Sequence, residues 1–394
     1  MRNQRWYRTF IWLAFGASLL ILAYLAPTLS KPEYIPVDDF VRYWAAGRLN
    51  LNGDNPYDPA LIEQLQTEAG GQAPESGIMP IMLNPPWALP LTMLFGWLDY
   101  PLSRLAWLMV NIALLLLCAE ALWNYYDCPR RLRWVSWLVV FLFAPTISVL
   151  EKGQITPILL VGITGFIYFT EKRPNAWLAG ISLALTTIKP QLIYLFGLSL
   201  LLWIIQKREW KVLVRAIACV FTLGAIAVAF NPSVYAEYIY AMRFYPTSEW
   251  ATPTIGTHLR YWIDLDKTWL QLIPLLIGFA FLARFRRKQG TVWDWHKETP
   301  WLLMVSLATT PYAWTYDLVL LAPALVQVVS WLLRDKRRWH NALILGFLAI
   351  LSALDLYLHR FWNDFWFVWL APSLLAWYVW VYLQRTKTLQ EYAQ

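Results

Sequence analysis

Residues 101–133, PLSRLAWLMVNIALLLLCAEALWNYYDCPRRLR, contain the pattern that decides the fold. Their first part, 101–124, is an apolar run with few charges. It is long enough for a transmembrane helix, which needs ~20 residues. The basic cluster Arg130, Arg131 and Arg133 follows, as is typical of a span that enters a cytoplasmic loop. The same alternation recurs along the chain and predicts an all-α, polytopic membrane protein.

The composition of the 394 residues agrees with this class. Hydrophobic residues make up 58% of the chain and charged residues only 15%, whereas soluble domains carry roughly 25% charged residues. The 26 Trp, 21 Tyr and 19 Phe residues suit a protein whose aromatic side chains lie at membrane interfaces. These values exclude a soluble enzyme and a disordered chain.

The net charge of +8 does not indicate a nucleic-acid partner, because the basic residues form short clusters between apolar runs. Cys118, Cys128 and Cys219 are too few and too scattered for a disulfide framework or a thiolate metal site. The chain has no Gly-rich phosphate loop and no convincing spacing of metal ligands. We therefore expect neither a metal nor a cofactor.

Twelve apolar runs are candidate spans. They cover about 10–26, 101–124, 134–150, 155–170, 176–188, 191–206, 212–230, 268–285, 300–310, 316–333, 341–358 and 365–383. The first follows Arg2, Arg5 and Arg8 as a signal peptide would. It is long, however, and lacks an obvious small-residue cleavage site, so we interpret it as a retained span.

The basic clusters predict the orientation. If both termini are cytoplasmic, 22 of the 33 Lys and Arg residues lie in inside segments, in keeping with the positive-inside bias. The chain, 1–394, is then one integral membrane domain of the plasma membrane. Two sizeable segments, 27–100 and 231–267, lie on the extracytoplasmic side.

The first extracytoplasmic loop is expected to contain interfacial helices. Residues 37–50 read as a short helix, and Asp58-Pro59 begins a second helix that ends at Gly70-Gly71. Residues 85–98 are apolar, but a full span there would invert every later loop. We expect an interfacial or re-entrant helix instead.

Asp39, Arg42 and Tyr43 share one face of the expected helix 37–50, because they are spaced i, i+3 and i+4. A carboxylate beside an apolar surface can act as a general base. An equally good interpretation is that Asp38 and Asp39 complement the positive N-terminus of this helix.

Lys189 and Gln154 lie between apolar runs. Lys189 could bind phosphate as a point charge, or it could extend to lipid headgroups; in neither case do we expect it to contact the protein core. Gln154 could bind a sugar hydroxyl, whereas Gly153 beside it could simply permit a tight turn.

Trp314, Tyr316 and Asp317 combine aromatic faces with a carboxylate, which suits stacking on a sugar ring. An aromatic belt at the membrane interface is the alternative. His258 and Arg260 could meet an anion, although residues of this kind at a membrane surface more often contact headgroups.

The order of several short motifs resembles glycosyltransferase family 87. The motifs are DFVRYWAAGR (39–48), GDNPYD (53–58), NPPW (84–87), GQ (153–154), KP (189–190) and PYAW (311–314). The resemblance covers about 35–330. It implies a multi-pass enzyme of the GT-C type, similar to the polyprenyl-phosphate-mannose-dependent mannosyltransferases of bacterial envelopes.

The resemblance also implies that Asp39, which matches the acidic residue at the start of the first outer loop, is the catalytic base. Asp38 is left with a capping or supporting role. The segment around Trp314 departs from the family pattern: Thr310 and Ala313 replace serines, and Tyr316 replaces a histidine whose role does not transfer.

We therefore expect an inverting glycosyltransferase on the outer face of the membrane. A polyprenyl-phosphate sugar, mannose by resemblance, would be the donor and an envelope glycolipid or glycan the acceptor, and membrane lipids would surround the protein. The expected substrate-binding residues are Asp38, Arg42, Tyr43, Tyr57, Gln154, Lys189, His258, Arg260, Trp314 and Tyr316. Two other interpretations stay open: a lipid or sugar transporter or flippase, and an envelope polysaccharide ligase or polymerase.

The orientation can be tested with topology reporters. We predict that a reporter fused after Lys297 is cytoplasmic and that one inserted within 63–77 is extracytoplasmic, because this arrangement places most basic residues inside. Reporters that both reported the same side would overturn the predicted topology.

Overall fold

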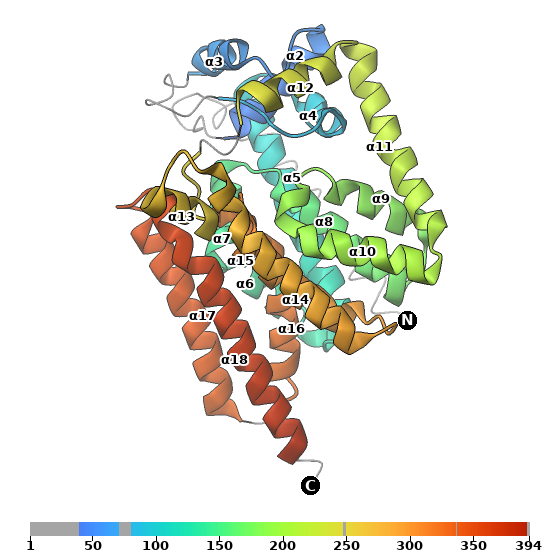
Figure 1. Ribbon diagram of the computed structural model, residues 1–394, viewed down its shortest axis with the longest axis vertical. Coiled ribbons are helices and arrows are strands. Elements are labelled where there is room, and N and C mark those ends of the chain that lie inside the picture. Colours follow the sequence, from blue (N-terminus) through green and yellow to red (C-terminus); the bar gives the residue numbers. More distant parts are fainter. Residues whose placement is uncertain (1–38, 71–79, 247–249, 336, 392–394) are drawn as a thin grey trace.

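A computed structural model describes residues 39–70, 80–246, 250–335 and 337–391 (Figure 1). Within these ranges every regular element is a helix, which confirms the all-α prediction. The expected first span, 10–26, and Asp38 lie outside the described residues.

Seven helical segments of the described residues are long and apolar enough to cross a membrane, so the chain is a multi-pass membrane protein. They are Tyr100–Tyr125, Pro190–Lys207, Trp210–Phe230, Thr268–Gln289, Thr315–Leu332, Trp339–Leu358 and Asp364–Thr386. The elements that form them are α5 (Tyr100–Tyr125), η5 (Pro190–Ile193) with α10 (Tyr194–Lys207), α11 (Trp210–Phe230), η7 (Thr268–Leu272) with α14 (Ile273–Gln289), η8 (Thr315–Leu321) with α16 (Ala322–Leu332), α17 (Arg338–Leu358), and η9 (Asp364–Trp369) with α18 (Leu370–Glu391).

The remaining predicted spans in the described residues are shorter or broken, so the count of twelve is not confirmed. The run 134–150 becomes α6 (Trp134–Phe141) and α7 (Ala144–Lys152), which are bent by 67°. The bend lies where Pro145 begins a new helix, since proline cannot donate a hydrogen bond to a preceding turn. The others are α8 (Thr156–Ile167) with a π-helical turn (Tyr168–Lys172), α9 (Ala176–Thr186) and α15 (Trp295–Thr309).

We call 27–100 and 231–267, which are predicted to be extracytoplasmic, the first and second outer segments. The described residues of the first contain α2 (Phe40–Asn52), α3 (Pro59–Glu68), η2 (Pro86–Ala88) and α4 (Leu89–Gly96). The two helices predicted around 37–50 and after Asp58 are therefore present. The carboxylate of Asp58 accepts a hydrogen bond of 2.9 Å from the Ala60 amide, as expected of an N-cap followed by proline. Residues 85–98 form only the short helices η2 and α4.

Figure 1 shows how these elements are arranged. Helices α2, α3, α4 and α12 (Val234–Phe244) gather at one end of the bundle, whereas α17 and α18 lie side by side along one flank and α11 runs along the other. Helix α13 (Ile255–Ile263), which belongs to the second outer segment, lies near one end of α17. The short helix η3 (Arg130–Leu132) precedes α6 in the chain. Segment η8–α16 is completely buried among the other helices.

Two glycines bring α2 and α4 into direct backbone contact. A Cβ on Gly47 would lie 2.7 Å from the carbonyl carbon of Thr92, and a Cβ on Gly96 would lie 2.6 Å from the amide nitrogen of Arg48. Either approach is shorter than a carbon side chain tolerates. The contact fixes α2, whose N-terminus carries Asp39, on the rest of the outer segment.

We predict that Gly47→Ala destabilises the protein by about 1–3 kcal/mol, because the added methyl group would overlap the α4 backbone. Gly197→Ala is the matched control, since Gly197 also lies inside a helix but an added Cβ has open space around it. Thermal unfolding in detergent checks both changes. An equal melting temperature for Gly47→Ala and the control would contradict the close packing of α2 on α4.

Candidate active site

A cavity of about 550 Å³ lies where the outer segment meets the helical bundle. This volume is within the range of small-molecule sites in proteins. Its walls come from segments far apart in the sequence. They are formed by Asp39, Arg42, Tyr43, Ile81, Met82, Leu83, Asn84, Pro85, Trp87, Lys152, Gln154, Thr187, Ile188, Lys189, Pro190, Gln191, Tyr238, Met242, Trp250, Pro311, Tyr312, Trp314, Tyr316 and Asp364.

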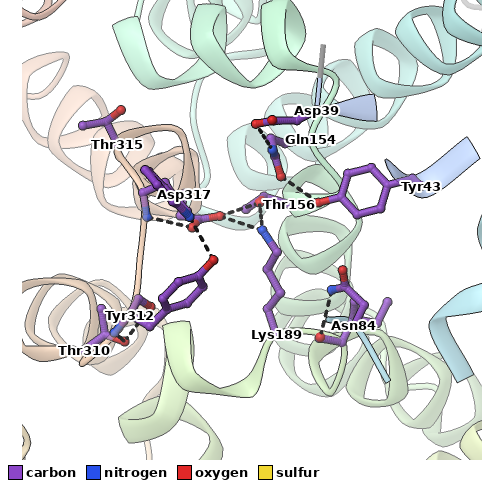
Figure 2. Close-up of polar contacts among 12 residues, drawn as sticks. Asp39, Tyr43, Asn84, Gln154, Thr156, Lys189, Thr310, Tyr312, Thr315 and Asp317 are labelled. Atoms are coloured by element: carbon purple, nitrogen blue, oxygen red, sulfur yellow. Dashed lines mark hydrogen bonds and ion pairs between the residues drawn. The ribbon is translucent and has the colours of Figure 1, made fainter. Parts of the chain in front are cut away.

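Asp39 is held in the cavity wall by a chain of hydrogen bonds. The Gln154 amide donates to Asp39 Oδ2 at 2.8 Å, and the Tyr43 hydroxyl donates to Gln154 Oε1 at 2.7 Å (Figure 2). Arg42 lies 3.7 Å from Asp39 Oδ1. Burial and the Asp39 carboxylate raise the pKa of Tyr43 far above its usual value, so its hydroxyl stays a donor and sets the orientation of the Gln154 amide.

The position of Gln154 depends on the glycine before it. Gly153 ends α7 with φ = 63°, a left-handed conformation that glycine adopts without strain. A Cβ there would also lie 2.7 Å from the Cβ of Phe40. Glycine is therefore required both by the turn and by the packing of α2 against it.

Helix α5 holds the same turn from the other side. Arg104 donates to the carbonyl oxygens of Leu150 and Glu151 at 2.9 and 2.7 Å, and the Trp107 indole donates to the Gly153 carbonyl at 2.7 Å. These bonds satisfy carbonyls at the C-terminus of α7 that have no partner within the helix. The sequence alone did not single out either residue.

Lys189 takes part in a buried ion pair with Asp317. Its Nζ lies 3.2 Å from Asp317 Oδ1 and 3.3 Å from the Thr156 hydroxyl (Figure 2). Thr156 donates to Asp317 Oδ1 at 2.6 Å, and the Trp314 amide donates to Oδ2 at 3.0 Å. Lys189 thus contacts the protein interior, contrary to the expectation that it would contact only phosphate or headgroups.

The turn that carries Lys189 is anchored by the 84–87 segment. The Asn84 amide donates to the Ile188 carbonyl at 3.3 Å, and the Trp87 indole donates to the Thr187 hydroxyl at 2.9 Å. The Tyr57 hydroxyl donates in turn to the Asn84 carbonyl at 3.0 Å. Tyr57 is buried behind Asn84, and its contact with the cavity is through that residue.

Trp314 and Tyr316 form an aromatic part of the wall. Their rings are stacked with centroids 6.3 Å apart. The Trp314 indole donates to the Tyr312 hydroxyl at 2.9 Å, and Lys189 Nζ lies 5.4 Å from the centre of the Tyr316 ring. This side of the cavity therefore combines aromatic faces with a nearby cation.

His258 and Arg260 lie away from the cavity wall, on α13. His258 is buried and stacks on Phe365 with ring centroids 4.0 Å apart. Burial lowers the pKa of its imidazole, so the ring is neutral at pH 7. Arg260 Nη2 donates to the Leu265 carbonyl at 2.6 Å, and its Nη1 donates to Gln271 at 3.2 Å. The structure thus gives both residues local partners in the second outer segment.

The cavity also contains charged residues to which the sequence had assigned no role. Lys152 precedes the Gly153 turn and Asp364 follows α17, and both line the wall. For Asp317 the sequence does carry a signal, because an acid within the apolar run 316–333 is costly unless it is paired. Among the residues that the structure describes, no group of three or more His, Cys, Asp or Glu side chains could hold a metal ion.

Residues 83–292 match the family model described as glycosyltransferase family 87. No curated protein and no solved structure matched the chain. The matched range includes the turns that carry Lys152, Gln154 and Lys189, and it leaves out Asp39 and the segments after α14.

We predict that alanine substitutions of Lys152 and Lys189 have different effects on the stability of the protein. Lys189→Ala leaves Asp317 buried without its cation and should destabilise the protein by about 3–5 kcal/mol. Lys152 is partly exposed, and within the described ranges no ion pair to it is present. Lys152→Ala should therefore leave the melting temperature in detergent nearly unchanged.

The double variant Lys189→Met, Asp317→Leu provides the control, because an apolar pair can replace a buried ion pair without loss of stability. We expect Lys189→Ala to lose activity as well as stability. The double variant should recover most of the thermal stability but none of the activity. Full recovery of both would reduce Lys189 to a structural residue.

Proposed function

Because the chain belongs to glycosyltransferase family 87, we propose that it transfers a sugar, with inversion, from a polyprenyl-phosphate donor to a hydroxyl group of an envelope glycolipid or glycan. Mannose is the sugar that the family resemblance favours. We place the reaction on the outer face of the plasma membrane, where the distribution of basic residues puts the first outer segment.

The observation that carries the proposal is a carboxylate and three cations in the wall of one cavity. Two carboxylates, Asp39 and Asp364, line the wall, and we assign the role of base to Asp39; Arg42, Lys152 and Lys189 are the cations. Sugar transfer from a lipid phosphate needs a base for the attacking hydroxyl and positive charge for the departing phosphate. The cavity supplies both kinds of group.

In the proposed reaction Asp39 accepts the proton of the acceptor hydroxyl while the hydroxyl oxygen bonds to the anomeric carbon of the donor. The bond between that carbon and the phosphate oxygen breaks, and polyprenyl phosphate leaves with the bonding electron pair. Gln154 already donates to Asp39 Oδ2, so we assign the hydroxyl to Oδ1, which lies beside Arg42. The phosphate leaves as an anion and needs no proton, so one carboxylate suffices.

The three cations are not equivalent as phosphate ligands. Lys189 is already compensated by Asp317 at 3.2 Å, and Arg42 lies beside Asp39. In the part of the chain that the structure describes, Lys152 is the cavity cation without a recorded acidic partner. We therefore assign the main phosphate contact to Lys152, with Lys189 as a second contact deeper in the wall.

Helix α12 supports a lipid donor. Tyr238 and Met242 line the cavity, while Ile239, Tyr240 and Phe244 of the same helix are exposed by 65%, 56% and 54%. An apolar helix surface next to the cavity offers a route for an isoprenoid chain to reach the membrane while the phosphate and sugar lie inside.

The role of Asp39 is tested by Asp39→Asn, which keeps the size of the side chain and removes its basicity. We expect kcat to fall by on the order of 10²-fold or more, the usual loss for a general base. Turnover should be measured at saturating polyprenyl-phosphate mannose and acceptor, so that weaker binding does not count as lost chemistry.

Asp54→Asn is the matched control, since Asp54 is exposed in the same outer segment and does not line the cavity. Asp38→Asn separates the two neighbouring acids and should cost much less than Asp39→Asn. Near-normal kcat in Asp39→Asn, or an inactive Asp38→Asn, would transfer the role of base to another acid.

A further inference from the structure

A second carboxylate reaches the cavity from the C-terminal part of the chain. Asp364 begins η9, at the connection between α17 and α18. It lines the same cavity as Asp39, which comes from the opposite end of the chain. It lies outside the range 83–292 that matches the family. No step of the reaction described above uses it.

The Asp364 carboxylate is held by three donors. His359 Nε2 lies 2.9 Å from Oδ1, the Thr315 hydroxyl also donates to Oδ1, and the Thr315 amide donates to Oδ2 at 3.1 Å. Its side chain is 11% exposed. These bonds fix the plane of the carboxylate against Thr315, the residue that follows Trp314.

A charged imidazole stands behind this carboxylate. His359 Nδ1 lies 2.9 Å from the carbonyl oxygen of Asp355 and 3.0 Å from its carboxylate, and its ring stacks on Phe367 with centroids 3.7 Å apart. Burial lowers the pKa of His359, but the hydrogen bonds to Asp355 and Asp364 outweigh it and raise the pKa to about 10. The imidazolium thus persists at neutral pH and places a positive charge beside the Asp364 carboxylate.

Counting acceptor positions shows what Asp364 can still bind. An ionised carboxylate has about four acceptor positions, two on each oxygen. The three donors take both positions on Oδ1 and one on Oδ2. One position on Oδ2 is left for a donor in the cavity. Trp314 precedes Thr315, which donates to Asp364, and it supplies an aromatic face to the same cavity.

We propose that Asp364 binds a hydroxyl group of the transferred sugar, with its ring against Trp314, and that His359 is the positioning residue for this carboxylate. A sugar hydroxyl is a donor, and a hydrogen bond to an ionised carboxylate is stronger than one between neutral groups. The proposal rests on the proposed function, and it assigns the sugar to the side of the cavity formed by η8 and η9.

The experiment uses the full chain in detergent with polyprenyl-phosphate mannose and its monodeoxy analogues, each of which lacks one ring or exocyclic hydroxyl. Asp364→Asn should lower kcat/KM for the complete donor by about 10- to 100-fold, the value of one charged hydrogen bond. With the analogue that lacks the bound hydroxyl, Asp364→Asn and the unaltered protein should react equally well.

Two variants control for folding and position. Asp266→Asn removes an exposed acid of the second outer segment that does not line the cavity, and it should behave as the unaltered protein. His359→Gln should raise the donor KM, with the same analogue again removing the difference. A loss of the same size with every analogue, or unchanged kinetics in Asp364→Asn, overturns the proposal.

Failure of the proposed function is recognised separately. If the unaltered protein transfers sugar from no polyprenyl phosphate, the donor assignment is wrong. Asp364 is then tested in a binding experiment with methyl mannoside and its monodeoxy analogues, in which tryptophan fluorescence measures the bound fraction. Binding weakened by Asp364→Asn and equalised by one analogue supports the sugar contact. Binding that does not change in Asp364→Asn rejects it.

Discussion

The ion pair between Lys189 and Asp317 is the constraint on which the arrangement of the site depends. The two residues are 128 positions apart in the chain, and Asp317 is completely buried. Burying either charge alone would be very costly, so the η5 turn and the start of η8 must come together. Thr156 joins the pair from α8, and three segments of the bundle thereby meet at one point of the cavity wall.

A second set of bonds connects the outer segment to this point. Gln154 lies two residues before Thr156 and donates to Asp39, so the short stretch after α7 holds both the deep ion pair and the carboxylate at the N-terminus of α2. Arg104 and Trp107 secure that stretch from α5. A displacement of this turn would therefore move the acid and the cations together, which keeps their relative geometry constant.

The sequence predicted the parts of the structure that depend on local pattern. The apolar runs within the described residues form helices, and a helix begins after Asp58 at Pro59. Asp39, Arg42 and Tyr43, predicted to share one helix face, all line one cavity. The sequence did not predict which charged residues line the cavity, because that depends on packing between segments far apart in the chain. A charge near an apolar run looks the same at Lys189 and at Arg260, yet the first lines the cavity and the second binds its own loop.

The lengths of the predicted spans were also beyond what the local sequence pattern determines. The runs that became α8, α9 and the α6–α7 pair are apolar enough for spans, but prolines and tight turns shorten or bend them. Asp364 carried no signal in the sequence, because a lone acid at a hairpin tip is ordinary until the fold brings Thr315 and His359 to it.

The complete burial of η8–α16 has a consequence for how the protein responds to its membrane. Lipids contact the helices at the periphery of the bundle, such as α11 and α17, whose candidate spans are only 22% buried. Helices exposed to lipid adjust their tilt when the bilayer thickness differs from their hydrophobic length. A helix enclosed by protein is not subject to that mismatch directly. Since Trp314, Tyr316 and Asp317 lie at the start of this enclosed segment, this part of the site is insulated from changes in lipid composition that tilt the lipid-exposed helices.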